Sequence, residues 1–257
     1  MNIIVCVKRV PQTADAEVRV DSTGKDIERE RLTFDMNEAD TYALEEAVLF
    51  KEKFSGTVTA VSVGQPDAQE TLRIALAKGA DEAIRVKAED FDELDGFKTA
   101  QLLAAVIKDI PHDVVFAGCM ATDDYYSQVG VALAQLLDVR HATLVTKIEG
   151  GEGKVQVYRE LEGGLLEHLD MSLPAVVSVQ TGISVPRYAS LIAIRKAAKK
   201  EIKTIGQDEI SKDDLQLNSR IEELFVPPVT KRAEMLEGGP EEVSGRLAEI
   251  IKEKGLI

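Results

Sequence analysis

The alternation of strand-type and helix-type segments over residues 1–140 is the feature that most restricts the fold of this chain. Short β-branched runs alternate with amphipathic segments of helical periodicity. A helix between two strands favours parallel pairing, so this order predicts an α/β protein with an open, mostly parallel sheet and helices on both faces. The predicted strands are 2–10, 57–64, 82–87 and 112–120, and the predicted helices are 37–54, 66–80, 95–110 and 125–138.

Beyond residue 140 the pattern changes to successive strands joined by glycine-rich turns. These runs predict antiparallel additions to the sheet. A helix follows from Leu191, with Leu191, Ile194, Ala198 and Ile202 on one stripe. The four runs are 142–150, 154–161, 165–173 and 175–181.

The C-terminal part is polar and contains Pro227 and Pro228 before a short closing helix that begins near Pro240. Such a composition predicts an extended arm rather than part of a compact core. We therefore expect a nucleotide-binding α/β domain over 1–205 and a C-terminal arm and helix over 206–257.

The composition of the chain supports a buried core and argues against several classes of protein. Apolar residues make up 44% of the chain, with no Trp, so the core is built from aliphatic residues, as in helix-covered parallel sheets. The formal net charge of −14 argues against general binding to nucleic acid or to anionic membranes. No apolar run approaches the roughly 20 residues of a membrane-spanning helix. We expect a cytoplasmic protein without membrane insertion and without a nucleic-acid partner.

Residues 187–203 are positively charged, in contrast to the rest of the chain. They carry six cations against one acid, Glu201, which gives +5 locally and leaves −19 for the rest of the chain. One interpretation is the solvated face of a helix, whose dipole favours cations toward its C-terminus. The other is a docking surface that steers an acidic partner. The cations are Arg187, Arg195, Lys196, Lys199, Lys200 and Lys203.

Motifs of independent catalysis are absent from the sequence. There is no Gly-x-Gly-x-x-Gly after the first strand and no Walker-type loop, and the glycines around Gly150 indicate a hairpin turn. The histidines are isolated, and Cys6 and Cys119 have neither a metal spacing nor a disulfide framework around them. The residues alone therefore predict a binding or carrier module without a metal site rather than an enzyme.

In an open parallel sheet, ligands bind outside the carboxyl ends of the strands. The loops after Val7, Val63 and Gly118 are therefore the candidate ligand site. Backbone amides at a helix start, such as those near Tyr125–Val129, can hold a phosphate.

Three collinear segments resemble the β subunit of electron transfer flavoprotein. They are "VCVKRVP" at 5–11, "GCMATDDYYSQVG" at 118–130, and the long run 158–202, which contains "LPAV" and "PRY". The resemblance covers nearly the whole chain. It implies a fold like that of the adenine nucleotide α-hydrolases and a heterodimer with an α subunit.

The resemblance also implies a route for electrons. In that family the α subunit holds most of an FAD, over which the β subunit closes, and the β subunit binds AMP structurally. A recognition loop of the β subunit, here 184–203, docks on acyl-CoA dehydrogenases of fatty acid β-oxidation. A quinone oxidoreductase then removes the electrons from the FAD. Thr13 and Ala39 fall in segments that would face this FAD.

The same resemblance places a nucleotide at the strand ends identified above. Asn37 begins a helix, and its alternatives are capping that helix or supporting a phosphate. Asp123 and Asp124 are expected to order the loop, to cap a helix or to bind ribose hydroxyls. The implied site residues are Cys6, Asn37, Glu38, Ala39, Asp40, Val63, Gly118, Ala121, Thr122, Asp123, Asp124, Tyr125, Tyr126, Ser127, Gln128 and Val129.

The sequence leaves two possible ligands for this site, AMP and a second FAD. Tyr125, Tyr126 and Ser127 depart from both the AMP-type and the FAD-type pattern of the family. Because two tyrosines would fill the space that an isoalloxazine needs, we favour AMP. The alternative is an electron-bifurcating subunit that binds a second FAD and oxidises NADH. A stand-alone nucleotide-binding or stress-type protein of similar fold is the unrelated alternative.

For the docking surface, the resemblance assigns the anchoring leucine to Leu191 and partner-facing cations to Lys196 and Lys199, with Arg195 on an adjoining face. A leucine in a partner's pocket can act as a binding hot spot, while the cations accelerate association. Arg187 and Tyr188, beside Pro186, are expected to shape the loop.

Overall fold

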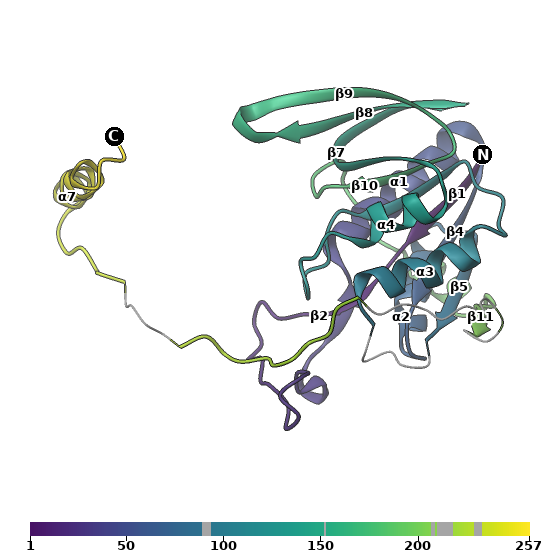
Figure 1. Ribbon diagram of the computed structural model, residues 1–257, viewed down its shortest axis with the longest axis horizontal. Coiled ribbons are helices and arrows are strands. Elements are labelled where there is room, and N and C mark those ends of the chain that lie inside the picture. The colour runs from purple at the N-terminus through teal and green to yellow at the C-terminus, as the bar shows by residue number, and fades with distance from the viewer. Residues whose placement is uncertain (89–93, 152, 207–208, 210–217, 229–232) are drawn as a thin grey trace.

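The computed structural model describes residues 1–88, 94–151, 153–206, 209, 218–228 and 233–257 (Figure 1). Its main sheet has the strand order β11-β5-β4-β1-β6-β10-β7-β8-β9. Pairing is parallel from β11 to β7 and antiparallel from β7 to β9. These strands are β1 (Asn2–Cys6), β4 (Thr57–Val63), β5 (Glu82–Lys87), β6 (Val114–Gly118), β7 (Arg140–Gly151), β8 (Lys154–Leu161), β9 (Leu165–Ser172), β10 (Ala175–Val179) and β11 (Lys203–Gly206).

Helices cover both faces of this sheet, which confirms the predicted α/β class. The helices are α1 (Glu38–Phe54), α2 (Ala68–Lys78), α3 (Gly96–Ile107), α4 (Val129–Leu136), α5 (Leu191–Ala197) and α7 (Pro240–Glu253). A small antiparallel ribbon of β2 (Arg9–Pro11) and β3 (Phe34–Met36) lies between β1 and α1 in the chain. The segment between them, predicted as a loop or hairpin, contains an antiparallel bridge of Val20 with Ile27.

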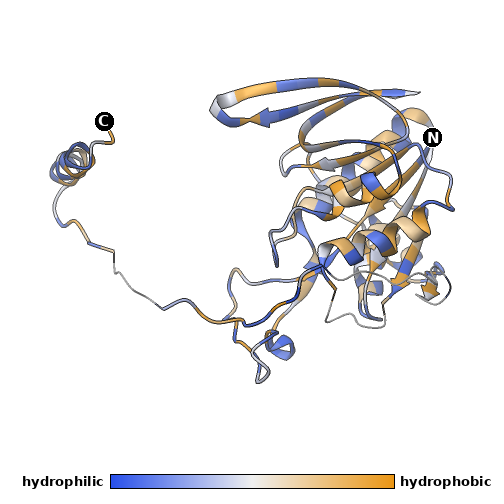
Figure 2. Cartoon of the chain, in the orientation of Figure 1, coloured by the Kyte–Doolittle hydropathy of each residue, from blue (hydrophilic) through white to orange (hydrophobic). Residues whose placement is uncertain are grey.

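Alternate side chains of the central strands supply two separate cores. Val5 and Phe116 pack with α1 and α2 on one face. Ile4 and Val115 pack with α3 and α4 on the other. Because both faces are covered, the parallel strands carry mostly apolar residues on both faces, which explains their long β-branched runs. Figure 2 shows these apolar segments within the helix-covered domain.

The predicted antiparallel orientation is wrong for β10. This strand lies between β6 and β7 and is parallel to both. Leu173 donates its N–H to Gly153, and Ala175 donates to Asp113 just before β6. The β8–β9 excursion therefore returns the chain to the amino-terminal edge, from which β10 starts in the same direction as β6.

Two predicted helices are shorter than their sequence periodicity suggests. The helix expected from residue 125 begins at Val129, because Tyr125 and Ser127 have φ of 57° and 54°, outside the right-handed helical region. The helix from Leu191 ends at Ala197, and the chain re-enters the sheet as β11, a strand that the sequence did not predict.

The C-terminal arm leaves the domain, and α7 lies apart from it (Figure 1). None of the residues of α7 is buried. The part of the predicted arm at 207–208, 210–217 and 229–232 lies outside the described residues. Within the described part of the chain, every helix is too short or too polar to cross a membrane.

Candidate functional site

The carboxyl ends of β1 and β6 mark the point where the connections change from one face of the sheet to the other. The helix α1 packs on one face and α4 on the opposite face (Figure 1). The ladder between β1 and β6 stops at Val5 and Phe116, although each strand continues to pair with its other neighbour. The two strand ends therefore diverge, and such a switch point is where open α/β sheets bind ligands.

Asn37 stands directly before α1, but its side chain does not cap the helix. Its Nδ2 donates to the carbonyl oxygen of Met120 at 2.9 Å, and its Oδ1 accepts from the backbone N–H of Thr122 at 3.1 Å. Of the two roles expected for Asn37, side-chain capping is therefore excluded. The buried amide instead ties the loop after β6 to the start of α1.

Asp40 connects the same helix to both strand ends. Its Oδ2 accepts from the backbone N–H of Lys8 at 2.7 Å, and its Oδ1 accepts from that of Gly118 at 3.0 Å. A Cβ at position 118 would lie 2.3 Å from Oδ1, so only glycine allows this approach. Burial raises the pKa of Asp40 to about 6, although both N–H donors favour the ionised form.

Two helix starts flank this switch point with available donors. The backbone N–H groups of Glu38 and Ala39, and those of Ser127, Gln128 and Val129, donate to no acceptor among the described residues. Positive φ at Tyr125 and Ser127 turns successive amides in the manner of an anion-binding nest. Donors of this kind, supported by the helix dipole, can hold a phosphate group.

Lys8 closes one side of the site. Its Nζ lies 2.7 Å from Asp123 Oδ1 and 2.9 Å from Asp124 Oδ2. Burial lowers the pKa of Lys8, but Asp123 and Asp124 outweigh this effect and raise the pKa overall. The two aspartates therefore order the loop through Lys8, one of the roles expected for them. Sequence reasoning missed Lys8, although its position directly after β1 was the available signal.

The thiols near the switch point are not nucleophiles. Cys6 is buried, and burial, followed by the charge of Asp40, raises its pKa to about 12. Burial likewise raises the pKa of Cys119. Both groups stay protonated at neutral pH. Cys6 thus serves as a small buried residue at the end of β1.

The structure brings the predicted site residues to one edge of the sheet. Cys6 and Val63 end β1 and β4, Asn37 to Asp40 start α1, and Gly118 to Val129 connect β6 to α4. The expectation that the tyrosines fill the space of an isoalloxazine stays a prediction. Tyr125 and Tyr126 are 62% and 58% exposed, so neither belongs to the core.

A second candidate site is the recognition segment, residues 184–203. Several of its apolar side chains face solvent: Tyr188 is 99% exposed and Leu191 is 76% exposed. The predicted stripe is not the buried face of α5, because Ala197 is buried while Ile194 is exposed. The prediction that Tyr188 is structural is wrong, since its ring has almost no packing contact.

The cations of the recognition segment have two different environments. Arg187 binds Glu45 and Glu52 of α1, and Lys200 Nζ donates to the carbonyl oxygens of Ala80 and Asp81. These two cations anchor the segment at its ends. The predicted docking cations Arg195, Lys196 and Lys199 are exposed and, with Ile192, line a shallow cavity of about 210 Å³.

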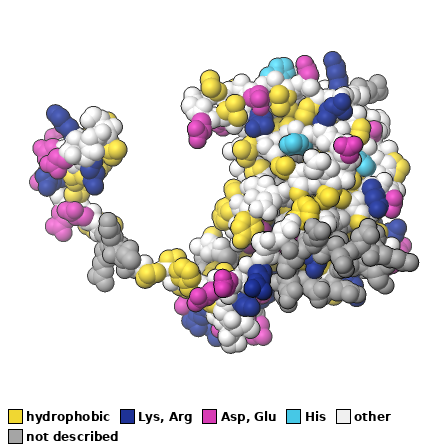
Figure 3. Space-filling model, viewed as in Figure 1, with side chains coloured by type: hydrophobic (Ala, Val, Ile, Leu, Met, Phe, Trp, Pro, Cys, Tyr) yellow, Lys and Arg dark blue, Asp and Glu magenta, His cyan; other side chains and the backbone are white. Residues whose placement is uncertain are grey.

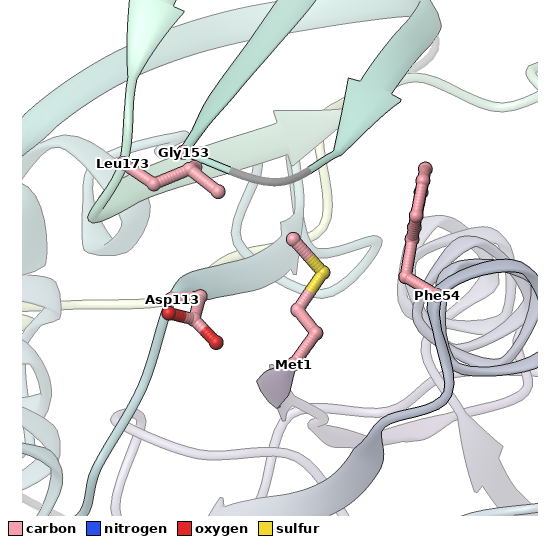
Figure 4. A pocket seen from close by; sticks show the side chains of 5 residues that line it. All are labelled: Met1, Phe54, Asp113, Gly153 and Leu173. Atoms are coloured by element: carbon pink, nitrogen blue, oxygen red, sulfur yellow. The ribbon is translucent and has the colours of Figure 1, made fainter.

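A cavity of about 270 Å³ lies at the opposite, amino-terminal edge of the sheet (Figure 4). It is lined by Met1, Phe54, Asp113, Gly153 and Leu173. The carboxylate of Asp113 accepts from the backbone N–H of Asn2 at 2.6 Å. The carboxylate of Asp113 thus already has a partner within the fold. The cavity is also remote from the switch point.

The arm is fixed to the domain at its root. Asp95 caps α3 by accepting from the N–H of Lys98, and its other oxygen accepts from the N–H groups of Asn218 and Ser219. Beyond this point the arm exposes apolar side chains, visible in Figure 3, among them Phe225 and Val226. The backbone N–H of Leu224 donates to the carbonyl oxygen of Gly24 at 2.7 Å, so the arm contacts the domain a second time, while its apolar side chains stay exposed.

The fold defines an open α/β protein with a candidate ligand edge at a switch point, and its arm and recognition segment expose apolar side chains. The match of residues 25–210 to the model of the electron transfer flavoprotein domain identifies the family. The chain belongs to the electron transfer flavoprotein family, as the resemblance predicted.

Full-length relatives support this assignment. The chain is 37% identical to electron transfer flavoprotein subunit beta of Methylophilus methylotrophus, over 98% of each chain. It is 36% identical to the protein of the same name from Bacillus subtilis (strain 168), over 100% of each. It is 35% identical to caffeyl-CoA reductase-Etf complex subunit CarD of Acetobacterium woodii, again over 100% of each.

Proposed function

We propose that the chain is the β subunit of a heterodimeric electron transfer flavoprotein and binds AMP structurally at the switch point. The observation that carries the proposal is the set of free amides at the starts of α1 and α4, beside a Gly118 that has no room for a side chain. The subunit is an electron carrier that has no catalysis of its own. The FAD that carries the electrons is held mainly by the α subunit.

The charge of the site favours AMP over a second FAD. Lys8 is the cation at the mouth, and Asp123 and Asp124 already neutralise it. The amides at the start of α4 then remain as the donors for one phosphate group. A pyrophosphate would bring a second phosphate close to the aspartates, where like charges repel. The exposed tyrosines do not contribute to this preference.

Counting nucleotides tests the choice directly. The heterodimer is purified and denatured, and the released nucleotides are separated and quantified. One FAD and one AMP per heterodimer are expected. Two FAD without AMP would favour the alternative, an electron-bifurcating subunit that oxidises NADH, and reduction of the flavins by NADH would then be observed.

The recognition segment is proposed to dock on a flavoenzyme of the acyl-CoA dehydrogenase type in fatty acid β-oxidation. Electrons then pass from that enzyme to the FAD. Leu191 is the anchor, and Arg195, Lys196 and Lys199 steer the acidic partner. Its exposure supports this role, because Leu191 has little packing to lose in the free protein. A quinone-linked oxidoreductase takes the electrons onward, and the complex works in the cytoplasm.

The arm and α7 are proposed to bind the α subunit. Among the described residues α7 buries none of its side chains, although apolar Leu247 lies on it. A helix of this length with an unburied apolar face gains stability from a partner. Removal of residues 218–257 is expected to abolish co-purification of the α subunit, whereas an unchanged complex would contradict the proposal.

A further inference from the structure

The diverging ends of β1 and β6 leave two backbone donors that the sheet does not satisfy. The ladder between the strands ends at Val5 and Phe116, yet the N–H groups of Lys8 and Gly118 both reach the carboxylate of Asp40. One oxygen of Asp40 serves each strand. The side chain thus bridges the gap where direct pairing has stopped.

A carboxylate matches this position better than any side chain of similar size. Its two oxygens both accept, as two facing N–H donors require. An amide offers one acceptor and turns its NH₂ toward the other donor, which then stays buried without a partner. The same contact explains why residue 118 is a glycine, since a Cβ there would displace Oδ1 of Asp40.

We propose that Asp40 is the positioning residue of the nucleotide site, and that its carboxylate fixes the gap between the ends of β1 and β6. It acts through the backbone. Its two acceptors set where Lys8 emerges from β1 and where the loop that begins at Gly118 starts. The inference rests on the proposed binding of a nucleotide at this edge and adds the residue that shapes it.

The surroundings of Asp40 make this role dependent on pH. Burial raises its pKa to about 6. It faces the thiol of Cys6 at the end of β1, the charge of Lys8 just after β1, and the thiol of Cys119 just after β6. Because both thiols stay neutral and Lys8 stays charged at neutral pH, Asp40 is the group that titrates here. Below this pKa the carboxyl group of Asp40 is protonated, and one of its oxygens can no longer accept a hydrogen bond from its N–H donor. Protonated Asp40 thus resembles an asparagine side chain at this position.

The test compares AMP binding to the nucleotide-free heterodimer carrying wild-type chain or Asp40→Asn, by calorimetry at about pH 7.5 and about pH 5. At the higher pH the variant is expected to bind AMP on the order of tenfold more weakly, because one buried donor loses its acceptor. At the lower pH the ratio of the two affinities is expected to shrink to about twofold. The phosphate of AMP titrates equally in both proteins, so it cancels from the ratio.

The matched control is Glu46→Gln, which removes another buried carboxylate of α1 that is absent from the switch point. It is expected to leave AMP affinity unchanged at both pH values. Equal AMP affinity of wild type and Asp40→Asn, or a ratio that does not depend on pH, would overturn the inference while leaving nucleotide binding intact. Absence of AMP and FAD binding by the wild type would instead overturn the proposed function and the inference with it.

Wild-type protein alone provides a second measurement, which decides the matter if Asp40→Asn does not fold. Adenosine has no phosphate that titrates in this range, so its affinity reports the protein groups. It is expected to fall severalfold between about pH 7.5 and about pH 5. An adenosine affinity that stays constant over this interval would contradict the role of Asp40.

Discussion

Arg187 of the recognition segment and Glu45 of α1 form a bidentate ion pair, in which Nε and Nη2 both lie within 3.1 Å of carboxylate oxygens. The backbone N–H of Arg187 donates to the same carboxylate at 2.9 Å. Glu45 is buried, with 7% of its side chain exposed. This pair fixes the start of the recognition segment to a helix whose first turn lies in the proposed nucleotide site.

Replacement of Arg187 by Ala is expected to lower the free energy of unfolding by about 2 kcal/mol, because Glu45 keeps a buried charge without its partner. The expected cost is smaller than for a fully buried pair, because the side chain of Arg187 is 31% exposed and solvent screens its charge. Urea unfolding of the purified complex measures it. The control Arg19→Ala breaks an exposed pair with Glu17 and is expected to leave the free energy of unfolding almost unchanged. Equal effects of the two variants would contradict the structural role of Arg187.

Replacement of Leu191 by Ala is expected to raise the KM for an acyl-CoA dehydrogenase about tenfold or more, as for a hot-spot side chain. Heterodimer assembly and flavin content are expected to stay normal, since Leu191 is exposed and supports no core. Steady-state reduction of the complex by the dehydrogenase provides the measurement. Leu136→Ala, at an exposed leucine of α4, is the matched control. An unchanged KM for Leu191→Ala would rule out docking through this residue.

Replacement of Lys8 by Met is expected to weaken AMP binding several-fold. The change leaves Asp123 and Asp124 without their cation, and their negative charge then repels the phosphate. Isothermal calorimetry at low and high salt measures the effect, which salt should reduce. Lys53→Met, at a cation of α1 outside the site, serves for comparison. A variant with the affinity of the wild type would show that Lys8 does not balance the charge of the loop.

Asp40 predicts a specific dependence of stability on pH. Its pKa is raised to about 6 in the folded protein, above the value of an unfolded Asp. The folded state therefore binds this proton more tightly, so the contribution of Asp40 is most favourable below about pH 4 and is lost as pH rises through about 6. The loss amounts to about 3 kcal/mol. Other carboxylates titrate over the same range, so the quantity to measure is the difference from Asp40→Asn.

Urea unfolding of both proteins at about pH 4 and about pH 7 provides this difference. Wild type is expected to gain stability relative to Asp40→Asn on going to the lower pH. A difference that is independent of pH, or one of the opposite sign, would contradict the raised pKa of Asp40.

Replacement of Asp95 by Ala is expected to free the root of the arm. The variant loses the cap of α3 and the acceptor for Asn218 and Ser219, at a cost of about 1 kcal/mol for the cap. Limited proteolysis near residues 218–219 should become faster, and the affinity for the α subunit should fall. Asp95→Asn keeps an acceptor for the cap of α3, so it separates loss of the cap from loss of the contact with the arm. Unchanged proteolysis of Asp95→Ala would contradict the anchoring role.

The sequence by itself determined the class of fold and indicated which edge of the sheet is the candidate site. Both follow from local rules: β-branched runs alternate with amphipathic helices, and parallel sheets bind ligands at their carboxyl ends. The same rules indicated the loop after Gly118, whereas the family resemblance supplied Asn37 and Asp40 as site residues and Leu191 as the docking residue.

The tertiary structure decided what those residues do. Periodicity cannot show that Asn37 binds the chain more than eighty positions away, or that Arg187 pairs with Glu45 across 142 positions. It also cannot give the direction of β10, which depends on where the β8–β9 excursion returns. Such contacts depend on how distant segments meet, and no local propensity encodes them.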